Sequence, residues 1–546
     1  MMTIGLTIRG GVGASRSVTR PPRRAGRRVV AAAVALLTGL AMVLVPSGAA
    51  QAHRERPAQF PSGAGSVPTY RTGGPYLVVC AADTPERIAG LPKPLRKLNQ
   101  QLYAECVRDG FRSIQAAVDA VATRGTRILI QPGVYNERPS LAPLSPECAA
   151  IDESDVISYE QQVACPHLQN LITILGDGPD PGIACDDRLC DLQVEGTGAT
   201  PQDVVVDGRF QRHVVIRADR ADGIYFRNFS VQHAHEFALY ILETDGFVID
   251  DMVGRWNTSY GFLTFADDHG LYKDCEAYGN GDGGLYPGAA SPHYGARHSI
   301  EITRCNSHHN WAGLSGTAGN SLWVHDNDFH DNSVGVALDS LFPNHPGMPQ
   351  GYSRFTGNRI FSNNTDYYDN WRDGTCFLPE PQRGYDEGVV CPQGPAPTGT
   401  GILLAGGNAN EFSGNQIWDN WRTGAMQFFV PAVLRGDLDP DKQLDTSHYN
   451  QYVGNTMGRA PDGSTKPNGV DFWWDGEGIG NCWQANTSPS GAVTSDPSVL
   501  PDCSAPPVFT PPDPVKVQAL LACLGWAPNN LDPDGCAWVQ PPAPPT

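Results

Sequence analysis

CEAYGN at residues 275–280 recurs in varied form as CNSHHN (305–310), NDFHDN (327–332), NRIFSN (358–363) and NQIWDN (415–420), after a weaker copy, MVGRWN (252–257). Each copy alternates polar and apolar residues, ends in Asn and is usually followed within four residues by Gly and another apolar run. Where nothing is inserted, the step between terminal Asn residues is 22 or 23 residues. A period that short, with strand-type alternation inside it, is typical of a β-solenoid whose coils stack on their neighbours.

Composition agrees with a turn-dense, all-β body. The chain has 546 residues, with 60 Gly, 46 Pro and only 18% charged residues. A chain of this length can form a sizeable core, but its density of turn formers argues against a mostly helical fold.

The first 52 residues resemble an export signal in composition. They carry seven Arg and no acid, followed by the apolar run Val29 to Val45 and by Ala50-Gln51-Ala52. We interpret residues 1–52 as a signal peptide of the general secretory route or, given Arg27-Arg28, of the twin-arginine route. Loss of seven Arg would change the formal charge from -19 to -26, which disfavours nucleic acid and anionic lipid as partners. We therefore expect a secreted monomer that has no membrane attachment after signal cleavage.

All 14 cysteines follow the signal, and an even number in an exported chain predicts disulfides. The cysteines fall into six near-neighbour pairs: Cys80 with Cys106, Cys148 with Cys165, Cys185 with Cys190, Cys376 with Cys391, Cys482 with Cys503, and Cys523 with Cys536. Cys275 and Cys305 occupy the same position of adjacent copies. Because stacked strands lie roughly 4.8 Å apart, these two could either form a bridge or lie unbonded in a buried ladder.

The segment FRSIQAAVDAVATRGTRILIQPGVYNE (111–137) predicts how the solenoid begins. Ser113 can cap a helix with apolar residues at helical spacing, which Gly125 ends. A strand from Thr126 to Gln131 follows and is closed by the turn Pro132-Gly133. A helix in this position would cover the open apolar end of the stack.

This segment, with its Ile-Gln-Ala-Ala helix and its Ile-x-Pro-Gly-Val-Tyr turn, closely resembles the entry of the pectin-lyase-like right-handed parallel β-helix proteins. The Asn-ending copies are similar to the repeats of the same superfamily, over roughly residues 111–460. The resemblance implies a right-handed parallel β-helix with an N-terminal capping helix and loop insertions. It implies no single activity, because the superfamily includes polysaccharide lyases, hydrolases, uronate epimerases, phage spikes and adhesins.

We divide the chain accordingly into four parts. These are the signal peptide (1–52), an N-terminal lead segment (53–110), the β-helix (111–481) and a Pro-rich tail that contains disulfides (482–546).

Alignment of the copies separates the two faces of each strand. The expected inward columns are Tyr272, Ile302, Val324, Phe355, Phe412 and Ala277, Ser307, Phe329, Ile360, Ile417. The expected outward columns are Lys273, Thr303, His325, Thr356, Ser413, then Glu276, Asn306, Asp328, Arg359, Gln416, and then Tyr278, His308, His330, Phe361, Trp418. The terminal Asn residues are expected to be structural and to stack at a corner.

The third outward column, which we call the ring column, is a candidate glycan-binding stripe. Flat rings repeated once per coil suit the apolar faces of pyranose units, although they could also serve only to stabilise cross-strand pairs. Insertions at Pro287–Ser299, Leu341–Arg354 and Val430–His448 all fall at one corner and are expected to wall a groove. A fourth insertion, Asn364–Thr400, leaves from the Asn corner.

Two chemistries fit a saccharide-binding face. A lyase or uronate epimerase needs a base and a cation. The candidate bases are Lys273, Tyr278, His308 and His330, and the candidate Ca²⁺ ligands are Asp274, Asp282 and Asp326, with Glu276 and Asp328. Ser291-Pro292-His293 is similar to the Asp-Pro-His element of alginate C5-epimerases, with Ser in place of Asp. A glycoside hydrolase needs two carboxyl groups, for which Asp328 is a candidate together with Asp326, Asp339 and Glu276.

The sequence thus predicts a secreted protein that acts on a polysaccharide, as a lyase or epimerase ahead of a hydrolase. A noncatalytic solenoid that binds a cell-wall or cell-surface glycan is the alternative. The candidate catalytic residues are Lys273, His308, His330 and Asp328. The candidate substrate-binding residues are Glu276, Tyr278, Tyr286, His325, Asp339, Arg359, Phe361 and Trp418.

Overall fold

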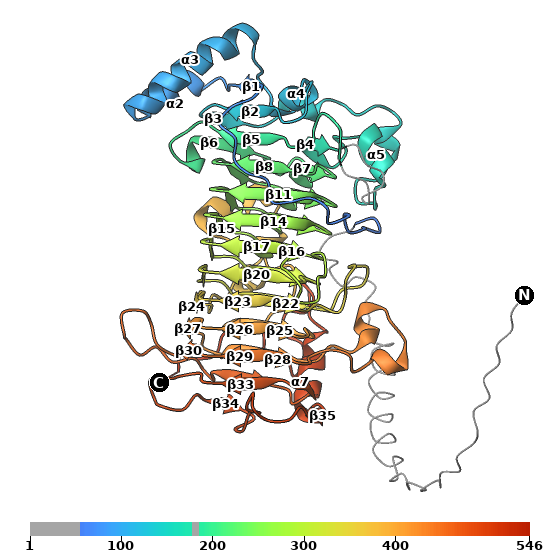
Figure 1. The fold of residues 1–546 in the computed structure, drawn as a ribbon, viewed down its shortest axis with the longest axis vertical. Coiled ribbons are helices and arrows are strands. Elements are labelled where there is room, and N and C mark those ends of the chain that lie inside the picture. The colour runs from blue at the N-terminus through green and yellow to red at the C-terminus, as the bar shows by residue number, and fades with distance from the viewer. Residues whose placement is uncertain (1–54, 177–184, 546) are drawn as a thin grey trace, which may run out of the picture. The chain divides into compact units, whose positions relative to one another are not determined.

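The computed structural model describes residues 55–176 and 185–545, and the predicted signal peptide lies outside these ranges. The described chain is a right-handed parallel β-helix built from three long sheets, in which each coil contributes one strand to each sheet (Figure 1). The fold class predicted from the repeat is confirmed.

Sheet 1 has 12 strands, in the order β1 (Tyr76–Val79), β2 (Arg127–Ile130), β5 (Gln193–Gly196), β8 (Ile224–Arg227), β11 (Asp245–Asp250), β14 (Asp268–Lys273), β17 (Ile300–Thr303), β20 (Leu322–His325), β23 (Arg354–Thr356), β26 (Glu411–Ser413), β29 (Gln451–Val453) and β33 (Cys482–Gln484). Sheet 2 has 10 strands, in the order β3 (Gly133–Tyr135), β6 (Val204–Asp207), β9 (Ser230–Gln232), β12 (Val253–Arg255), β15 (Glu276–Tyr278), β18 (Asn306–His308), β21 (Asp328–His330), β24 (Arg359–Phe361), β27 (Gln416–Trp418) and β30 (Thr456–Met457).

Sheet 3 has 11 strands, in the order β4 (Asn170–Leu175), β7 (Val214–Asp219), β10 (Phe237–Leu242), β13 (Phe262–Phe265), β16 (Gly283–Gly288), β19 (Ala312–Thr317), β22 (Val334–Asp339), β25 (Thr400–Ala405), β28 (Thr423–Phe428), β31 (Phe472–Trp474) and β34 (Ser495–Asp496). The pairings within the three sheets are parallel, whereas β32 (Gly478–Ile479) and β35 (Phe509–Thr510) form a separate antiparallel pair. The sheets begin before residue 111 with β1 and continue past residue 481 with β33 and β34.

The helices lie outside the coils. They are α2 (Thr84–Gly90), α3 (Lys93–Asp109), α4 (Ile114–Asp119), α5 (Tyr159–Ala164), α6 (Asp369–Arg372) and α7 (Pro514–Cys523). Among the described residues, no helix is long and apolar enough to cross a membrane.

Helix α4 is the predicted cap. The Ser113 hydroxyl accepts a hydrogen bond from the backbone N–H of Ala116 at 3.2 Å, as an N-cap residue does. Glu137 satisfies the N–H groups of Ile114 and Gln115, at 2.9 and 3.1 Å. The helix packs its apolar face onto the solenoid core, and it ends at Asp119, one turn and a half earlier than Gly125 would suggest.

The terminal Asn residues of the copies form a buried ladder at the corner between sheets 2 and 3. Their side chains are fully buried, and the amide of each bonds to the Asn of the next coil, for example from Asn280 Nδ2 to Asn310 Oδ1 at 2.8 Å. The same amide donates to the backbone carbonyl of Gly254 at 3.1 Å. The predicted structural role of these Asn residues is confirmed, because each bond satisfies a polar group that the corner buries.

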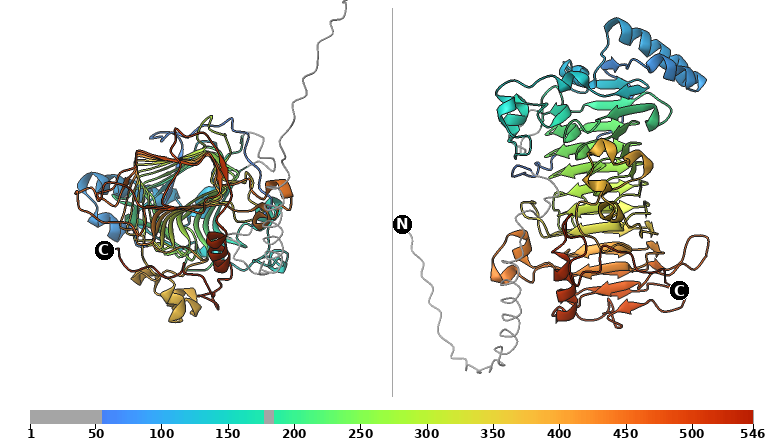
Figure 2. Two further views of the ribbon diagram at one scale, coloured as in Figure 1. Left: turned by 90° about the horizontal axis from the view of Figure 1, so that it is seen from below. Right: turned by 180° about the vertical axis from the view of Figure 1, so that it is seen from behind.

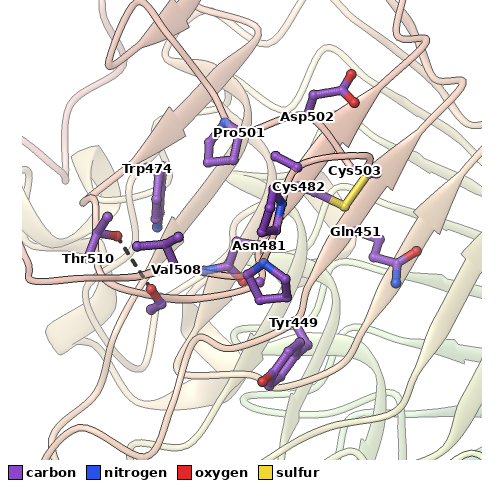
Figure 3. Close-up of a pocket in the computed structure, with 15 residues that line it drawn as sticks. Tyr449, Gln451, Trp474, Asn481, Cys482, Pro501, Asp502, Cys503, Val508 and Thr510 are labelled. Atoms are coloured by element: carbon purple, nitrogen blue, oxygen red, sulfur yellow. Dashed lines mark hydrogen bonds between the residues drawn. A yellow bond between two sulfur atoms is a disulfide. The ribbon is translucent and has the colours of Figure 1, made fainter.

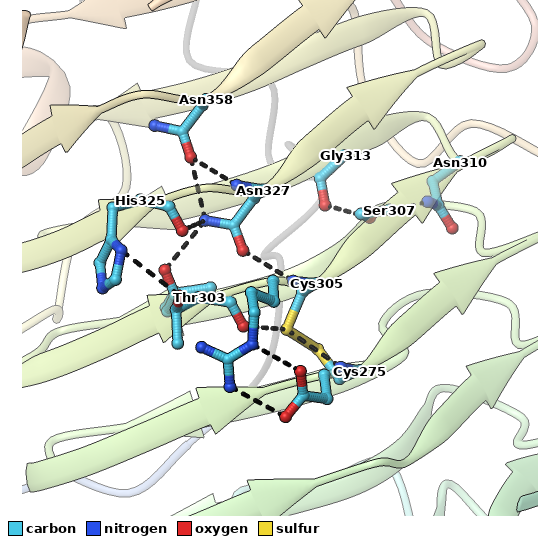
Figure 4. The surroundings of a disulfide bond; sticks show 12 residues. Cys275, Thr303, Cys305, Ser307, Asn310, Gly313, His325, Asn327 and Asn358 are labelled. Carbon is cyan, nitrogen blue, oxygen red and sulfur yellow. Dashed lines mark hydrogen bonds and ion pairs between the residues drawn. A yellow bond between two sulfur atoms is a disulfide. The ribbon is translucent and has the colours of Figure 1, made fainter. Parts of the chain in front are cut away.

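A second ladder lies at the corner between sheets 1 and 2, and the Cys275–Cys305 disulfide takes its first two positions (Figure 4). The Cys305 N–H donates to Asn327 Oδ1 at 2.9 Å, and Asn327 Nδ2 donates to Asn358 Oδ1 at 3.0 Å. The ladder then continues through Asn415. Of the two arrangements that the sequence allowed for these cysteines, the structure has the bridge.

The other 12 cysteines form the six predicted near-neighbour disulfides. The two predicted inward columns are also confirmed, because all ten side chains are completely buried and in register. The repeat therefore orders the core coil by coil.

The first described part of the lead segment, residues 55–75, lies against coils that come much later in the chain. Arg56 forms ion pairs with Asp219 at 2.9 Å and with Glu243 at 2.6 Å, and all three side chains are buried. Further along, the Gly65 N–H donates to Asp245 at 2.9 Å and the Tyr70 hydroxyl to Glu195 at 2.8 Å. Long insertions and α7 lie outside the ring of strands, as the end-on view shows (Figure 2).

Candidate functional site

The three outward columns have the register that the sequence predicted. Strand pairing aligns Lys273 with Thr303, His325 and the following coils on sheet 1. On sheet 2 it aligns the column of Glu276 and Asp328 and, next to it, the ring column. The candidate catalytic residues therefore divide between two sheets, with Lys273 on sheet 1 and the other three on sheet 2.

The rings of the ring column stack face to face along the solenoid. Successive centroids are 5.2, 5.1, 4.8 and 4.4 Å apart from Tyr278 to Trp418, with interplanar angles between 3° and 14°. Each internal ring thus has both faces covered by its neighbours and presents only its edge outward. The pyranose stacking that we expected of these faces has no free face to use between Tyr278 and Trp418.

The candidate catalytic side chains already have partners. Lys273 Nζ lies 3.2 Å from Asp250, and Asp328 is paired with Arg359. His308 Nε2 lies 3.2 Å from Glu276 Oε1. His330 bonds Asn306 through Nε2 at 2.9 Å and Asp331 through Nδ1 at 2.7 Å.

The candidate Ca²⁺ ligands lie apart from one another. Asp274 is paired with Arg304 at 2.7 Å, Asp326 contacts His325 at 2.9 Å, and Asp282 lies on sheet 3. Across residues 55–176 and 185–545, no three His, Cys, Asp or Glu side chains come together as a metal site. Calcium dependence stays a prediction.

Three predicted residues do come together, on the outer face of sheet 3. Asp282 precedes β16, Tyr286 lies within β16, and Asp339 ends β22. Tyr260 OH and Ser315 Oγ donate to Asp282 at 3.0 and 3.3 Å. We call Tyr260, Asp282, Tyr286, Ser315, Thr317 and Asp339 the sheet 3 acid site.

Asp339 is held across the strands. The Thr317 hydroxyl lies 2.9 and 3.0 Å from its two oxygens, and the Leu341 N–H donates at 2.9 Å. The ring of Tyr286, on the same sheet, is buried, and its hydroxyl is 3.2 Å from His345 Nε2. Asp339 keeps partial exposure to solvent, whereas the other members of the site are buried.

Both carboxyl groups of this site hold their protons unusually well. Burial raises the pKa of Asp282 to about 7, with a further contribution from the charge of Asp339 and opposition from the Tyr260 and Ser315 hydrogen bonds. Burial likewise raises the pKa of Asp339 to about 6, against the hydrogen bonds from Leu341 and Thr317. Near neutral pH the pair therefore tends to hold one proton, the state in which one carboxyl acts as an acid and the other as a base.

Insertions flank this face at both edges. The three predicted corner loops follow β16, β22 and β28 and lead into β17, β23 and β29, which places them between sheets 3 and 1. The Asn364–Thr400 insertion precedes β25 at the opposite edge of sheet 3. The three corner loops thus border sheet 3 away from the ring column, whereas the Asn364–Thr400 insertion leaves from the Asn corner, next to the ring-column strand β24.

Sequence reasoning missed Tyr260, Ser315 and Thr317. A signal was present in the Gly residues that open the sheet 3 strands, because aligning Gly313 and Gly335 puts Thr317 beside Asp339. Alternation of polar and apolar residues separates the two faces of the strands in sheets 1 and 2, but it gives no such signal in the buried strands of sheet 3.

The comparisons with known proteins agree with the fold. A family model described as "Right handed beta helix region" matches residues 213–428. Among curated proteins, none matches the chain. The matched residues lie within the coils, so the match agrees with the right-handed parallel β-helix fold.

Similar solved structures include the pectate lyase Pel9A, with 14% identity, a TM-score of 0.36 and coverage of 82% of this chain and 84% of that one. The A-module of the mannuronan C-5 epimerase AlgE4 from Azotobacter vinelandii is 13% identical, with a TM-score of 0.39 and coverage of 69% and 90%. The alginate lyase from Paenibacillus sp. str. FPU-7 is 8% identical, with a TM-score of 0.33 and coverage of 70% and 94%.

Proposed function

We propose that this protein is a secreted enzyme that hydrolyses a polysaccharide at the sheet 3 acid site. The observation that carries the proposal is the pair of carboxyl groups, Asp282 and Asp339, whose pKa values are raised to about 7 and about 6 on one loop-bordered face. Glycoside hydrolysis needs such a pair, one protonated and one ionised.

In this mechanism, Asp282 donates its proton to the glycosidic oxygen as the bond to the anomeric carbon breaks. Asp339 takes a proton from the attacking water or attacks the anomeric carbon itself, and water then completes the reaction. Tyr260 and Ser315 orient Asp282, while Thr317 and the Leu341 N–H orient Asp339. The hydroxyl groups and Tyr286 would line the bound sugar.

The test is incubation of the mature protein with a panel of neutral and uronate polysaccharides, followed by measurement of new reducing ends. Asp282→Asn and Asp339→Asn should each reduce turnover by roughly 100-fold or more. Asp462→Asn, at an exposed turn where Asp462 bonds only Ser464, is the matched control. Wild-type turnover by Asp339→Asn would refute the assignment.

A lyase or uronate epimerase is the second candidate, and one specific feature of sheet 1 favours it. Lys273 Nζ and Arg227 Nε each lie 3.2 Å from Asp250, so two cations share one carboxylate. Tyr225 also donates to Asp250, at 2.6 Å. Such a cluster could bind a uronate carboxylate and supply a base.

These chemistries differ in their products. A lyase gives unsaturated uronates that absorb in the ultraviolet, and an epimerase changes uronate proton NMR signals without shortening the chain. Both assays are to be run with and without Ca²⁺, because Asp274, Asp282 and Asp326 are candidate Ca²⁺ ligands and carboxylate oxygens are typical of Ca²⁺ sites. Binding without any turnover would favour the noncatalytic, glycan-binding alternative.

A further inference from the structure

A pocket of about 330 Å³ lies at the last coils, away from the sheet 3 acid site (Figure 3). Its lining includes Tyr449, which precedes β29, Gln451 at the start of β29, Trp474 at the end of β31, and Asn481. Residues 501–510, which we call the strap, supply most of the rest of the lining.

The strap is fixed at both ends. The Cys482–Cys503 disulfide ties its beginning to β33. Its end forms the β32–β35 pair, in which Gly478 is opposite Thr510, and the Thr510 hydroxyl donates to the Gly476 carbonyl. The pocket is therefore formed before any ligand arrives, which reduces the entropic cost of binding.

Tyr449 gives the pocket an accessible aromatic ring. Its side chain is 49% exposed, although it lies over the backbone of Gly480. A Cβ at Gly480 would meet ring atom Cδ1 at 2.4 Å, so only glycine allows this close approach. The remaining ring surface is available to an apolar partner, in contrast to the covered faces of the ring column.

The charge of the pocket restricts its ligand. Among the lining residues there is no Lys, Arg or His, and the only carboxylate is Asp502. Hydrogen bonds from Ser504 hold the pKa of Asp502 below its usual range, so it stays ionised at neutral pH. An anionic group would thus meet a negative charge and find no cation.

We infer that this pocket binds a neutral saccharide unit, with one sugar face on Tyr449 and hydroxyl groups bonded to Gln451 and Asp502. An aromatic ring beside amide and carboxylate groups is the combination that suits sugars, which have one apolar face and many hydroxyls. A uronate unit is disfavoured by Asp502. The inference rests on the proposed function, because it makes the pocket an accessory subsite for the polysaccharide hydrolysed on sheet 3.

The position of the pocket agrees with that role. Trp474 ends β31, which lies three strands from β22 and Asp339 in sheet 3. At roughly 4.8 Å per strand, the two sites are separated by about 15 Å along the stack. Only an oligosaccharide of several units could contact both, so the pocket should distinguish long substrates from short ones.

The first experiment is calorimetric titration of the full mature protein with cello-, xylo- and manno-oligosaccharides and with oligogalacturonate of equal length. At least one neutral oligosaccharide should bind, and oligogalacturonate should bind at least about tenfold more weakly, because a uronate would meet Asp502. Tyr449→Ala should weaken neutral binding about tenfold or more, whereas Tyr449→Phe should retain it, since stacking needs only the ring. Tyr76→Ala, which truncates another exposed tyrosine on β1, at the opposite end of sheet 1, is the control.

Asp339→Asn separates this inference from the proposed function. It should abolish hydrolysis while leaving neutral oligosaccharide binding intact, whereas Tyr449→Ala should raise KM for long substrates and leave short ones unchanged. Equal binding of oligogalacturonate, or unchanged binding and KM in Tyr449→Ala, would overturn the pocket assignment. Hydrolysis that persists without any pocket binding would overturn it too, and the acid site would stand.

Discussion

The Thr317 hydroxyl lies within hydrogen-bonding distance of both carboxylate oxygens of Asp339, at 2.9 and 3.0 Å, from the adjacent strand of sheet 3. Burial raises the pKa of Asp339 to about 6, and this hydroxyl works against that rise. The contact therefore adjusts the pH at which Asp339 becomes ionised, without itself touching the scissile bond.

Replacing Thr317 should move the activity profile along the pH axis. Thr317→Val keeps the shape of the side chain but removes the hydroxyl, so the pKa of Asp339 rises further and the acidic limb of the profile shifts upward by about one pH unit. A pH series of kcat for the hydrolysis assay measures this shift. Thr456→Val is a control on sheet 2, and a uniform loss of activity without a shift would contradict the role given to Thr317.

The buried Glu477 should make stability depend on pH. Burial, followed by the charges of Asp475 and Asp445, raises its pKa to about 10 from an ordinary 4.5, so the folded protein keeps this proton where the unfolded chain loses it. The free energy of unfolding consequently falls as pH rises from about 4.5 to about 10. Glu477→Gln should raise the Tm more at pH 8 than at pH 5. Equal changes of Tm at both pH values would contradict this.

The Cys275–Cys305 bridge should stabilise the fold, and the ladder in which it lies suggests a replacement. The bridge closes a separation of 30 residues, and its loss in the double Ser variant should cost about 2–4 kcal/mol. Asn at both positions would extend the ladder that begins at Asn327. The double Asn variant should therefore lose less free energy of unfolding than the double Ser variant. Chemical unfolding of the three proteins ranks them, and a double Asn variant no better than double Ser would speak against continuity of the ladder.

The Asn ladder between sheets 2 and 3 should be sensitive to a single truncation. Asn363 is fully buried and donates to Asn420 Oδ1 and to the Phe329 carbonyl, both at 3.1 Å. Asn363→Ala removes both bonds and deprives the buried backbone N–H of Asn332 of its acceptor, Asn363 Oδ1, which should cost about 1–3 kcal/mol. Asn529→Ala, at an exposed position, should change the free energy of unfolding by less than about 0.5 kcal/mol. An unchanged free energy of unfolding in Asn363→Ala would contradict this prediction.

The ring column offers a test of structure against binding. Trp418 is 4% exposed and stacks on Phe361 at 4.4 Å and 3°, so Trp418→Ala should lower stability by about 3–5 kcal/mol. His330→Ala, inside the column, should also destabilise the fold by removing two stacking contacts. If glycan binding falls in these two variants while their Tm is unchanged, the ring column is a glycan-binding stripe.

The sequence allows the fold and the register to be predicted because Asn and Gly recur at the corners. Tyr272 and Ile302, or His308 and His330, could be aligned without coordinates because sheets 1 and 2 keep a polar outer face and an apolar inner one. Sheet 3 has no such contrast, because β16, β19, β25 and β28 are buried along their whole length. Loops of unequal length cover that sheet, and their path does not follow the repeat.

The candidate site was predictable only in part for the same reason. Asp282, Tyr286 and Asp339 were selected singly, for different roles, and nothing in the chain's local pattern joined them. The face-to-face stacking of the ring column could not be predicted either. The sequence spacing shows which rings share a column, but it does not show whether the faces of those rings are free. Lys273 was selected as one of several candidate bases, whereas Asp250, which pairs with it, comes from the preceding coil and was not selected.

The lead segment determines an order of events in assembly. Arg56 and Gly65 hold Asp219, Glu243 and Asp245, which lie between 163 and 187 residues further along the chain. Residues 55–75 have no docking surface until those coils exist, so we expect them to attach late in folding. Residues 55–75 are thus fastened late, over coils that have already wound.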